Sequence, residues 1–192
     1  MQGFLNPEQV LKQLKLQEEM NAADFGSGSG GWAIPLAKKL EGGKVYAVDL
    51  LEEPLSALRA KINLGRITNI QIIRADVEKG VNIFEESLDL VLMTNLLFEV
   101  EDIKKVLQEG KRLLKRGGKI LVVDWKKDAP LGPKKRVSAE EIKKLAEEIG
   151  LKLEKPSTRA KLGAGPVPHR NEVSGAGEFS AGTYHFGLVL VK

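Results

Sequence analysis

The amino-acid sequence predicts a doubly wound α/β fold, in which helices cover both faces of a mostly parallel sheet. Short runs of Val, Ile and Leu alternate with helical apolar patterns, which is typical of parallel strands buried on both faces. A glycine-rich turn at 26–31 follows the first apolar run, and an acidic residue stands at the end of each of the first three apolar runs. The last two runs have no helix between them and should pair antiparallel. We therefore expect one seven-stranded sheet with an antiparallel C-terminal strand, in a single domain spanning 1–192.

The expected strands are short apolar runs bounded by turn residues. They cover residues 21–25, 44–50, 70–75, 88–93, 119–124, 151–155 and 184–191. A chain of 192 residues can bury roughly 70% of its unfolded surface, which is enough for one core of this kind.

The first three helices are expected before the first strand, after the first strand and after the second strand. Asn6 followed by Pro7 predicts an N-cap and a first helical position. Residues 32–40 and 52–62 carry apolar side chains at helical spacing. Each of these segments is therefore predicted to cover the sheet with one apolar face.

Two further helices are expected in the second half of the chain. Residues 103–114 have the apolar spacing of a helix, which the pair Gly117–Gly118 should bring to an end. Ser138 and Glu141 have the spacing of a capping box, and Gly150 should close the helix that follows them.

The segment 156–181 interrupts this regular alternation. Ten of its 26 residues are Gly, Pro or Ser, and no helical or alternating pattern is present. Loops of this length are uncommon inside a compact domain, and they are usually functional or disordered. We expect an insertion between the last two strands. It is either a lid over the carboxyl edge of the sheet, where the sixth strand should end, or a mobile segment without a role.

Composition narrows the class of protein. No apolar run approaches the ~18 residues of a membrane span, and residues 1–5 lack the build of a signal peptide, so we expect a cytoplasmic protein. The chain has no cysteine and two histidines, His169 and His185, so we expect no metal site. The net charge is +4, and Asp128 and two prolines break the densest basic run, 126–136. That pattern favours a solvated loop over a nucleic-acid surface.

The most specific pattern is a strand, a glycine turn, a helix and a second strand that ends in an acid. Glycine permits positive φ and lets a ligand approach the backbone closely. The N–H groups that open the following helix are available to such a ligand. Asp49 stands nineteen residues after Gly30, where it can accept the hydroxyls of a ribose. The sequence therefore predicts a site for an adenosine-containing cofactor.

The glycine spacing alone does not decide which cofactor binds. Gly26, Gly28 and Gly31 match the dinucleotide fingerprint, whereas Gly26, Gly28 and Gly30 match the alternative GxGxG spacing equally well. A hydride-transfer enzyme needs an acid/base group. The chain has no Tyr-x-x-x-Lys pair and no length left for a second, substrate-binding domain. An oxidoreductase is therefore the least favoured interpretation.

At this point the chain resembles the class I S-adenosylmethionine-dependent methyltransferases, from about Phe4 to Asp128 and again from Tyr184. Five motifs occur in order: Ala-Asp-Phe-Gly-Ser-Gly-Ser-Gly at 23–30, Val-Asp at 48–49, Ala-Asp at 75–76, 89–95, and Leu-Lys-Arg-Gly-Gly-Lys at 114–119. The nearest branch is the short ubiquinone/menaquinone-type (type 11) small-molecule methyltransferases. The resemblance implies a Rossmann-like fold, S-adenosylmethionine as the cofactor and S-adenosylhomocysteine as its product.

The resemblance also implies a role for each residue of the cofactor site. Asp24 would orient the amino group of the methionine portion, and Asn95 would lie beneath the sulfonium. Asp49 would accept the ribose hydroxyls, and Asp76 would accept the adenine amino group. Two side chains would pack against the adenine ring, namely Leu50 and Val77. Four residues would let the backbone approach the methionine portion and the ribose, namely Gly26, Ser27, Gly28 and Gly30.

The small-molecule acceptor cannot be named from these motifs. Methyl transfer from a sulfonium depends mainly on proximity, orientation and the exclusion of water, and it needs a base only where the acceptor loses a proton. Asp124, Tyr184 and His185 are the candidates for a catalytic role, and Trp125 could stack a flat acceptor. Two alternatives stay open: a methyltransferase acting on a macromolecule, and a cofactor-binding protein without turnover. The sequence also leaves the oligomeric state open.

Overall fold

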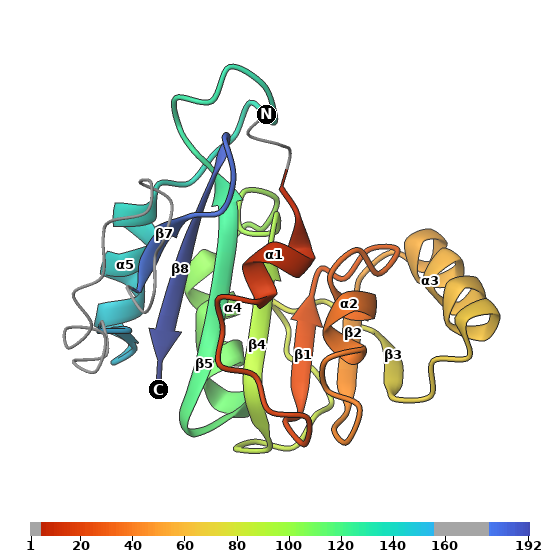
Figure 1. The fold of residues 1–192 in the computed structure, drawn as a ribbon. Coiled ribbons are helices and arrows are strands. Elements are labelled where there is room, and N and C mark those ends of the chain that lie inside the picture. The colour runs from red at the N-terminus through yellow and green to blue at the C-terminus, as the bar shows by residue number, and fades with distance from the viewer. Residues whose placement is uncertain (1–4, 156–176) are drawn as a thin grey trace, which may run out of the picture.

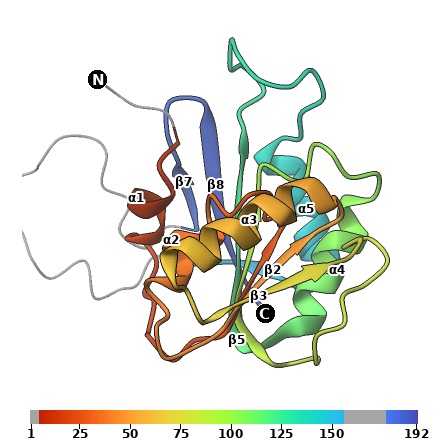
Figure 2. The same ribbon diagram turned by 90° about the vertical axis from the view of Figure 1, so that its right-hand side faces the viewer.

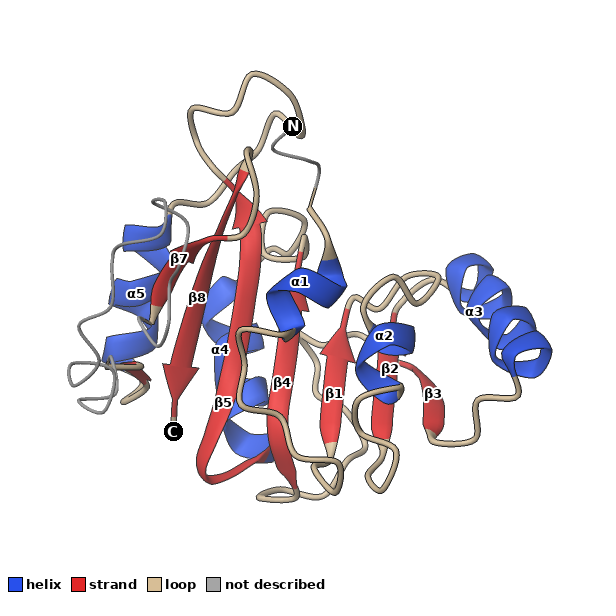
Figure 3. Cartoon of the chain, viewed as in Figure 1, coloured by secondary structure: helices blue, strands red, loops and turns tan. Residues whose placement is uncertain are grey.

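The computed structural model describes residues 5–155 and 177–192, which form one sheet with helices on both faces (Figure 1, Figure 3). The strands are β1 (Ala22–Phe25), β2 (Val45–Asp49), β3 (Ile70–Arg74), β4 (Leu88–Thr94), β5 (Leu114–Trp125), β6 (Lys152–Leu153), β7 (Glu178–Ser180) and β8 (His185–Val191). They lie in the order β3-β2-β1-β4-β5-β8-β6, and β7 also pairs with β8. β1 to β5 are parallel, and β8 is antiparallel to β5. The predicted doubly wound sheet is confirmed, but within the described residues it has eight strands rather than the expected seven, because β7 was not predicted.

The helices are α1 (Pro7–Leu11), α2 (Ala33–Ala37), α3 (Glu52–Gly65), α4 (Ile103–Leu113) and α5 (Ala139–Glu148). Two of them begin at the predicted caps. The Asn6 side chain accepts a hydrogen bond from the Gln9 N–H at 3.2 Å, and Ser138 Oγ accepts one from the Glu141 N–H at 3.2 Å. No helix within the described ranges is long and apolar enough to cross a membrane.

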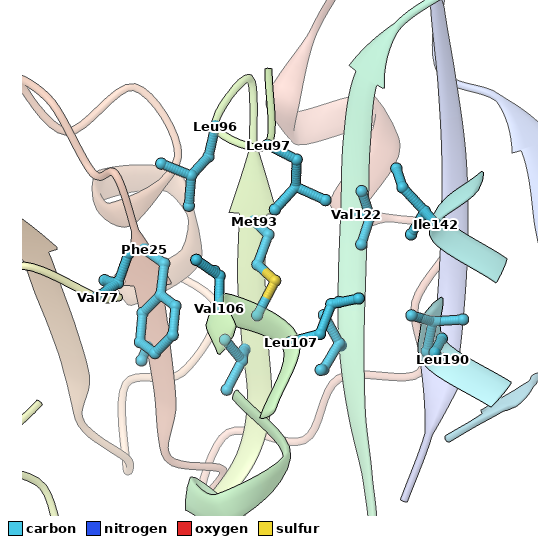
Figure 4. Close-up of a cluster of buried hydrophobic side chains, with 14 of the residues drawn as sticks. Phe25, Val77, Met93, Leu96, Leu97, Val106, Leu107, Val122, Ile142 and Leu190 are labelled. Atoms are coloured by element: carbon cyan, nitrogen blue, oxygen red, sulfur yellow. The ribbon is translucent and has the colours of Figure 1, made fainter. Parts of the chain in front are cut away.

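The sheet has a hydrophobic cluster on each face. Phe25, Met93 and Val122 point toward α4 and α5 (Figure 4). Ala22 and Leu92 point the other way and belong to the cluster that also contains side chains of α1, α2 and α3. Figure 2 shows α1 and α2 on one side of the sheet and α4 and α5 on the other. Since both faces are covered, the strands are continuous apolar runs rather than alternating ones.

The end of α4 differs from the prediction. The pair Gly117–Gly118 was predicted to end this helix, but α4 already ends at Leu113 and β5 begins with the next residue. Leu88 pairs with Leu114 and Leu90 pairs with Lys119, so residues 115–118 bulge out of β5. Gly117 has a φ of +75°, and such a bulge requires a conformation that glycine adopts readily.

β6 and β7 lie along the same edge of β8 and form one interrupted edge strand. β6 pairs with Leu190–Val191, and the Glu154 N–H donates to the Val189 C=O at 2.8 Å. The Val189 N–H in turn donates to the Gly177 C=O at 2.6 Å, after which β7 continues along β8 to Phe186. The chain therefore leaves this edge after Glu154 and returns to the same point at Gly177.

This arrangement corrects two expectations about the segment 156–181. Its last residues are not irregular, because β7 lies within it. The sixth strand was predicted to reach the carboxyl edge, but β6 stops beside Leu190, which pairs with Ile120 near the middle of β5. β7 reaches the carboxyl edge instead. Residues 156–176, with His169 and the proposed lid, lie outside the described part of the chain.

Candidate cofactor and acceptor site

The carboxyl ends of the parallel strands meet at one edge of the sheet, at the top of Figure 1. The strand order reverses here, because β1 lies between β2 on one side and β4 on the other. Open α/β sheets bind ligands in the crevice at such a reversal. Asp24, Asp49 and Asn95 lie at the ends of β1, β2 and β4, so the fold brings three of the predicted cofactor residues to this crevice.

The glycine turn after β1 has positive φ at Gly26 (70°), Gly28 (51°) and Gly30 (87°). A Cβ on Gly30 would overlap Leu58 of α3, and one on Gly26 would lie 2.9 Å from Leu96 Cδ1. These two glycines allow close packing of the protein itself. A Cβ on Gly28 would meet no atom within 4 Å. Gly28 is therefore the positive-φ glycine that leaves room for a ligand.

The Asp49 carboxylate connects this turn to α3. One oxygen accepts a hydrogen bond from the Gly28 N–H at 2.8 Å, and the other accepts one from the Leu51 N–H at 2.9 Å. Each carboxylate oxygen has more than one lone pair, so Asp49 can still accept the two hydroxyls of a ribose. Lys61 holds the outer side of the turn, since its Nζ donates to the Ser29 C=O at 2.8 Å and to Ser29 Oγ at 3.0 Å. No sequence pattern pointed to Lys61.

Asp24 is a buried carboxyl group without a hydrogen-bond partner among the described residues. Its side chain is 1% exposed, and both of its oxygens are unpaired. Burial raises the pKa of Asp24 to about 8. The nearby Ala33 N–H opposes this rise, although it does not meet the geometry of a hydrogen bond to either oxygen, and the Asp49 carboxylate adds to the rise. The group is therefore largely protonated at pH 7. A cationic ligand would stabilise its ionised form.

Unpaired polar atoms are concentrated at this edge of the sheet. Within the described residues, the buried side-chain atoms without a partner are both Asp24 oxygens, Ser27 Oγ, Asn95 Oδ1 and His185 Nε2. All four residues lie at the carboxyl ends of β1 and β4 or at the start of β8. Leaving such an atom unpaired costs about 1–3 kcal/mol. The unpaired atoms therefore mark a ligand site more specifically than the glycine motif does.

Asn95 has an unusual backbone conformation for a residue other than glycine. Its φ is +51°, a value that asparagine tolerates better than most residues. Its N–H donates to the Val123 C=O at 2.8 Å, while Oδ1 is left without a partner. The turn after β4 is thus held by β5 and presents the Asn95 amide group at the crevice.

The predicted adenine residues lie beyond β2 and β3. Asp76 accepts a hydrogen bond from the Glu78 N–H at 3.0 Å and forms an ion pair with Lys79 at 2.9 Å. The Lys79 ammonium, more than any other group, lowers the pKa of the Asp76 carboxyl. Leu50 is half-exposed whereas Val77 is buried in the α4 side of the core. A ligand would therefore meet Leu50 more directly than Val77.

Asp124, a candidate base, holds the chain that follows β4. Its two oxygens accept hydrogen bonds from the Leu97 N–H at 3.2 Å and from the Trp125 N–H at 2.7 Å. Burial raises the pKa of Asp124 to about 6, against the effect of the backbone N–H groups of Trp125, Leu97 and Phe98. Because Asp124 is fully buried and both of its oxygens accept hydrogen bonds from the backbone, it is better suited to positioning this turn than to taking a proton from a ligand.

The other acceptor candidates lie where β5 ends and β8 begins. Trp125 and His185 are cross-strand partners, with ring centroids 4.2 Å apart and planes at 44°. A Cβ on Gly132 would lie 2.5 Å from Trp125 Cε3, so the indole is covered on two sides. The idea that Trp125 stacks an acceptor is therefore not supported. Tyr184 is partly exposed, and its C=O accepts a hydrogen bond from the Lys126 N–H at 2.8 Å.

The basic run 126–136 is tied to the backbone. The Arg136 guanidinium donates to five carbonyl groups, which belong to Lys126, Lys127, Ala129, Leu131 and Pro133. Lys135 Nζ donates to the Val100 C=O at 2.7 Å. Arg136 therefore determines the shape of this loop at the carboxyl edge, a role that the sequence did not indicate.

Residues 23–122, just over half of the chain, match the model of a methyltransferase domain. The match spans β1 to most of β5 and contains the glycine turn, Asp49, Asp76 and Asn95. The chain belongs to the methyltransferase domain family, which confirms the predicted resemblance.

Particular relatives agree with this assignment. Over 116 residues the chain is 30% identical to a demethylmenaquinone methyltransferase of Shouchella clausii, covering 60% of this chain and 49% of that protein. A second demethylmenaquinone methyltransferase, from a Geobacillus species, is 25% identical over 126 residues, which cover 65% of this chain and 53% of that protein. The chain thus spans about half the length of the curated relatives it matches.

A solved structure matches nearly the whole chain. It is that of a SAM-dependent methyltransferase from Aquifex aeolicus, with a TM-score of 0.79 and 26% identity, covering 98% of this chain and 90% of that one. The structure of a phosphoethanolamine N-methyltransferase from Haemonchus contortus, solved with S-adenosyl-L-methionine, matches with a TM-score of 0.67 at 21% identity. The match covers 83% of this chain and 40% of that one. The latter similarity concerns the fold alone.

Proposed function

We propose that the protein transfers a methyl group from S-adenosylmethionine to a small-molecule acceptor, with S-adenosylhomocysteine as the product. The observation that carries this proposal is the group of unpaired buried polar atoms beside an open glycine turn, at the reversal of strand order. The family of the chain and the names of its relatives support the same chemistry.

The residues of the crevice fit the three parts of this cofactor. Asp49 has lone pairs left for the ribose hydroxyls, and Gly28 leaves space for a close approach to the backbone. Asp24 can accept the ammonium group of the methionine portion, which would satisfy an unpaired buried carboxyl. Asp76 keeps acceptor capacity for the adenine amino group beside its ion pair with Lys79. We assign Ser27 and Asn95 to the methionine and sulfonium region.

The cofactor, when bound, supplies a methyl carbon that is already activated for displacement. The protein contributes orientation and the exclusion of water. Lys61 holds the glycine turn through Ser29, and Asp124 holds the turn after β4 through the Leu97 N–H. These contacts keep the crevice preorganised before any ligand arrives, which lowers the cost of binding.

A small-molecule acceptor is favoured over a macromolecule. Arg136 and Lys135, in the densest basic run, donate to backbone carbonyl groups rather than pointing freely into solvent. Recognition of nucleic acid requires a surface of available cations. The demethylmenaquinone methyltransferases among the relatives also act, by their names, on a small molecule.

The test is thermal unfolding with S-adenosylmethionine, S-adenosylhomocysteine, NADH and NADPH, each added separately. A ligand that binds the native state raises the unfolding midpoint by mass action. We expect a rise with the two sulfur compounds and none with the nicotinamides. A rise with a nicotinamide alone would refute the proposal. Binding of the sulfur compounds without methylation of any acceptor would indicate the alternative of a binding protein without turnover.

A further inference from the structure

The basic loop, residues 126–136, projects beyond the carboxyl ends of the strands between β5 and α5, at the top of Figure 1 and of Figure 2. Five of its eleven residues are Lys or Arg and one is Asp, so the loop has a net charge of +4. The whole chain has the same net charge, which means that the residues outside the loop sum to zero. The excess positive charge of the protein is therefore located in one projecting loop.

The middle residue of the basic loop is apolar. Leu131 is 56% exposed and belongs to neither hydrophobic cluster of the described residues. A single exposed leucine is common on protein surfaces, but this one stands between two unengaged cations. Lys127 and Lys134 are exposed, and their ammonium groups have no hydrogen bond or ion pair within the described part of the chain. The loop therefore presents an apolar side chain flanked by available positive charge.

The inner side of the loop holds this tip in place. The Arg136 guanidinium donates to the Leu131 C=O at 2.9 Å and to the Ala129 C=O at 2.7 Å. Ala129 is buried, and the backbone at Gly132 lies against the indole of Trp125. The exposed position of Leu131 is thus built into the structure, and a surface that binds it does not have to order the loop first.

The other lysines of the loop point back toward the protein but keep their charge. Lys126 Nζ donates to groups that precede β8, among them the Thr183 C=O at 3.2 Å. Lys135 Nζ donates to the Val100 C=O at 2.7 Å. These acceptors are neutral, so both lysines add to the positive potential around the tip, although only Lys127 and Lys134 are free to contact a partner.

We propose that the basic loop binds the surface of an anionic lipid bilayer, with Leu131 inserted below the headgroups and Lys127 and Lys134 in contact with them. An anionic leaflet attracts cations that lie within a Debye length of its surface. Lysine stems can lie along apolar groups while their ammonium groups stay at the headgroups. Apolar side chains combined with basic ones are typical of segments that bind the interface. Binding of this kind goes beyond the methyl transfer proposed above and requires neither cofactor nor acceptor.

A bilayer fits the loop better than a nucleic acid does. The loop has no aromatic residue on which a base could stack, and the nearby Trp125 is covered by His185 and by the backbone at Gly132. Phosphate contacts would use the two free lysines but would leave Leu131 in water. A bilayer accommodates both the charge and the leucine. A protein bound in this way has the carboxyl edge of its sheet, with the cofactor crevice, toward the lipid.

The first test is sedimentation of the full chain with lipid vesicles. One set contains phosphatidylcholine alone, and the other contains an equal mixture of phosphatidylcholine and phosphatidylglycerol. We expect the protein to sediment with the anionic vesicles, to remain in solution with the neutral ones, and to be released from the anionic vesicles by high salt. Absence of binding to the anionic vesicles at low salt would overturn the proposal.

Charge variants locate the binding surface. Each lysine near an anionic leaflet contributes about fivefold in affinity, so Lys127→Gln combined with Lys134→Gln should bind about 30-fold more weakly. The matched control is Lys15→Gln combined with Arg116→Gln, which removes the same charge from exposed residues beside the amino-edge cavity. We expect its affinity to stay within about twofold of wild type. Asp128→Asn removes the one acid of the loop and should strengthen binding about fivefold. Equal weakening of the two double variants would overturn the assignment to this loop.

Tryptophan substitutions test insertion of the tip. Leu131→Trp should shift its fluorescence to shorter wavelength when anionic vesicles are added, whereas Leu64→Trp, at an exposed position near the end of α3, should not. Leu131→Ser should weaken binding about fivefold through the lost apolar contact, and Leu64→Ser should not. No fluorescence shift at position 131 would overturn the proposed insertion. Tighter binding to a duplex oligonucleotide than to anionic vesicles, unaffected by Leu131→Ser, would make nucleic acid the partner instead.

Discussion

The amino edge and the carboxyl edge of the sheet differ in whether their polar side chains have hydrogen-bond partners. At the amino edge, Asp89 accepts a hydrogen bond from the Asn21 N–H at 2.8 Å and two from Lys115 Nζ at 2.9 Å. A cavity of about 180 Å³ lies there, lined by Asp89, Lys115 and apolar side chains such as Leu14. At the carboxyl edge lie the unpaired atoms of Asp24, Ser27, Asn95 and His185. Polar groups that are already hydrogen-bonded around a cavity indicate a structural role, whereas buried polar groups without partners indicate a ligand-binding site.

The largest difference between the edges should appear in the pH dependence of Asp24→Asn. Between about pH 4 and pH 8 the folded protein keeps a proton on Asp24 that the unfolded chain has released. The unfolded state then binds fewer protons, so wild-type stability falls as the pH rises through this window. The asparagine does not titrate. We therefore expect the free energy of unfolding of Asp24→Asn, relative to that of wild type, to increase by at least about 3 kcal/mol from pH 4 to pH 8.

Denaturant titrations at several pH values measure this effect. Asp89→Asn is the matched control, because it loses the ion pair with Lys115 and should be less stable than wild type at pH 7. Parallel pH profiles for wild type and Asp24→Asn would contradict the assignment of a protonated carboxyl.

Removing a carboxylate at each edge should separate binding from stability. Asp49→Ala loses the acceptor for the ribose and the contact with the Gly28 N–H, so we expect S-adenosylhomocysteine to bind about 100-fold more weakly. Asp89→Ala should lower the free energy of unfolding by about 2 kcal/mol through its lost hydrogen bonds, with affinity within about twofold of wild type. Calorimetry and denaturation give the two quantities. Equal losses of affinity in both variants would contradict the comparison.

Two glycines of one turn should show the same separation on a smaller scale. Gly28→Ala places a methyl group in open space at positive φ, so we expect about tenfold weaker cofactor binding and a cost of about 1 kcal/mol in stability. Gly30→Ala forces a methyl group against Leu58, so we expect about 2 kcal/mol of destabilisation. Calorimetry measures the affinity of each variant for the cofactor product, and denaturation measures its stability. If Gly28→Ala binds normally, the ligand does not approach this backbone.

The smallest effect is expected at Asp76, which is already paired with an exposed lysine. Asp76→Asn should reduce the preference for an adenine over a hypoxanthine base by about fivefold, since one polar contact changes. Competition between S-adenosylhomocysteine and its inosine analogue measures this ratio. An unchanged ratio would remove Asp76 from the site and leave it as the residue that orders the turn after β3.

The sequence predicted the sheet and most of the crevice because both follow from local patterns. Buried parallel strands are apolar runs that can be recognised in the sequence. Asp24, Asp49 and Asn95 stand at the carboxyl ends of such runs, and these ends meet at one edge of a parallel sheet. The bulge at residues 115–118 escaped prediction because a glycine pair ends a helix or bends a strand with equal ease. The interrupted edge strand and the Arg136 loop escaped it because both depend on contacts between residues distant from any motif. The contact of Lys61 with the glycine turn is of the same kind.

The most direct test of the ligand site is to follow backbone amide resonances while S-adenosylhomocysteine is added. We expect the largest shifts at Ser27, Gly28 and Asn95, and little change at residues 115–119 beside the amino-edge cavity. The opposite distribution, with the largest shifts at residues 115–119, would contradict the placement of the ligand site at the carboxyl edge.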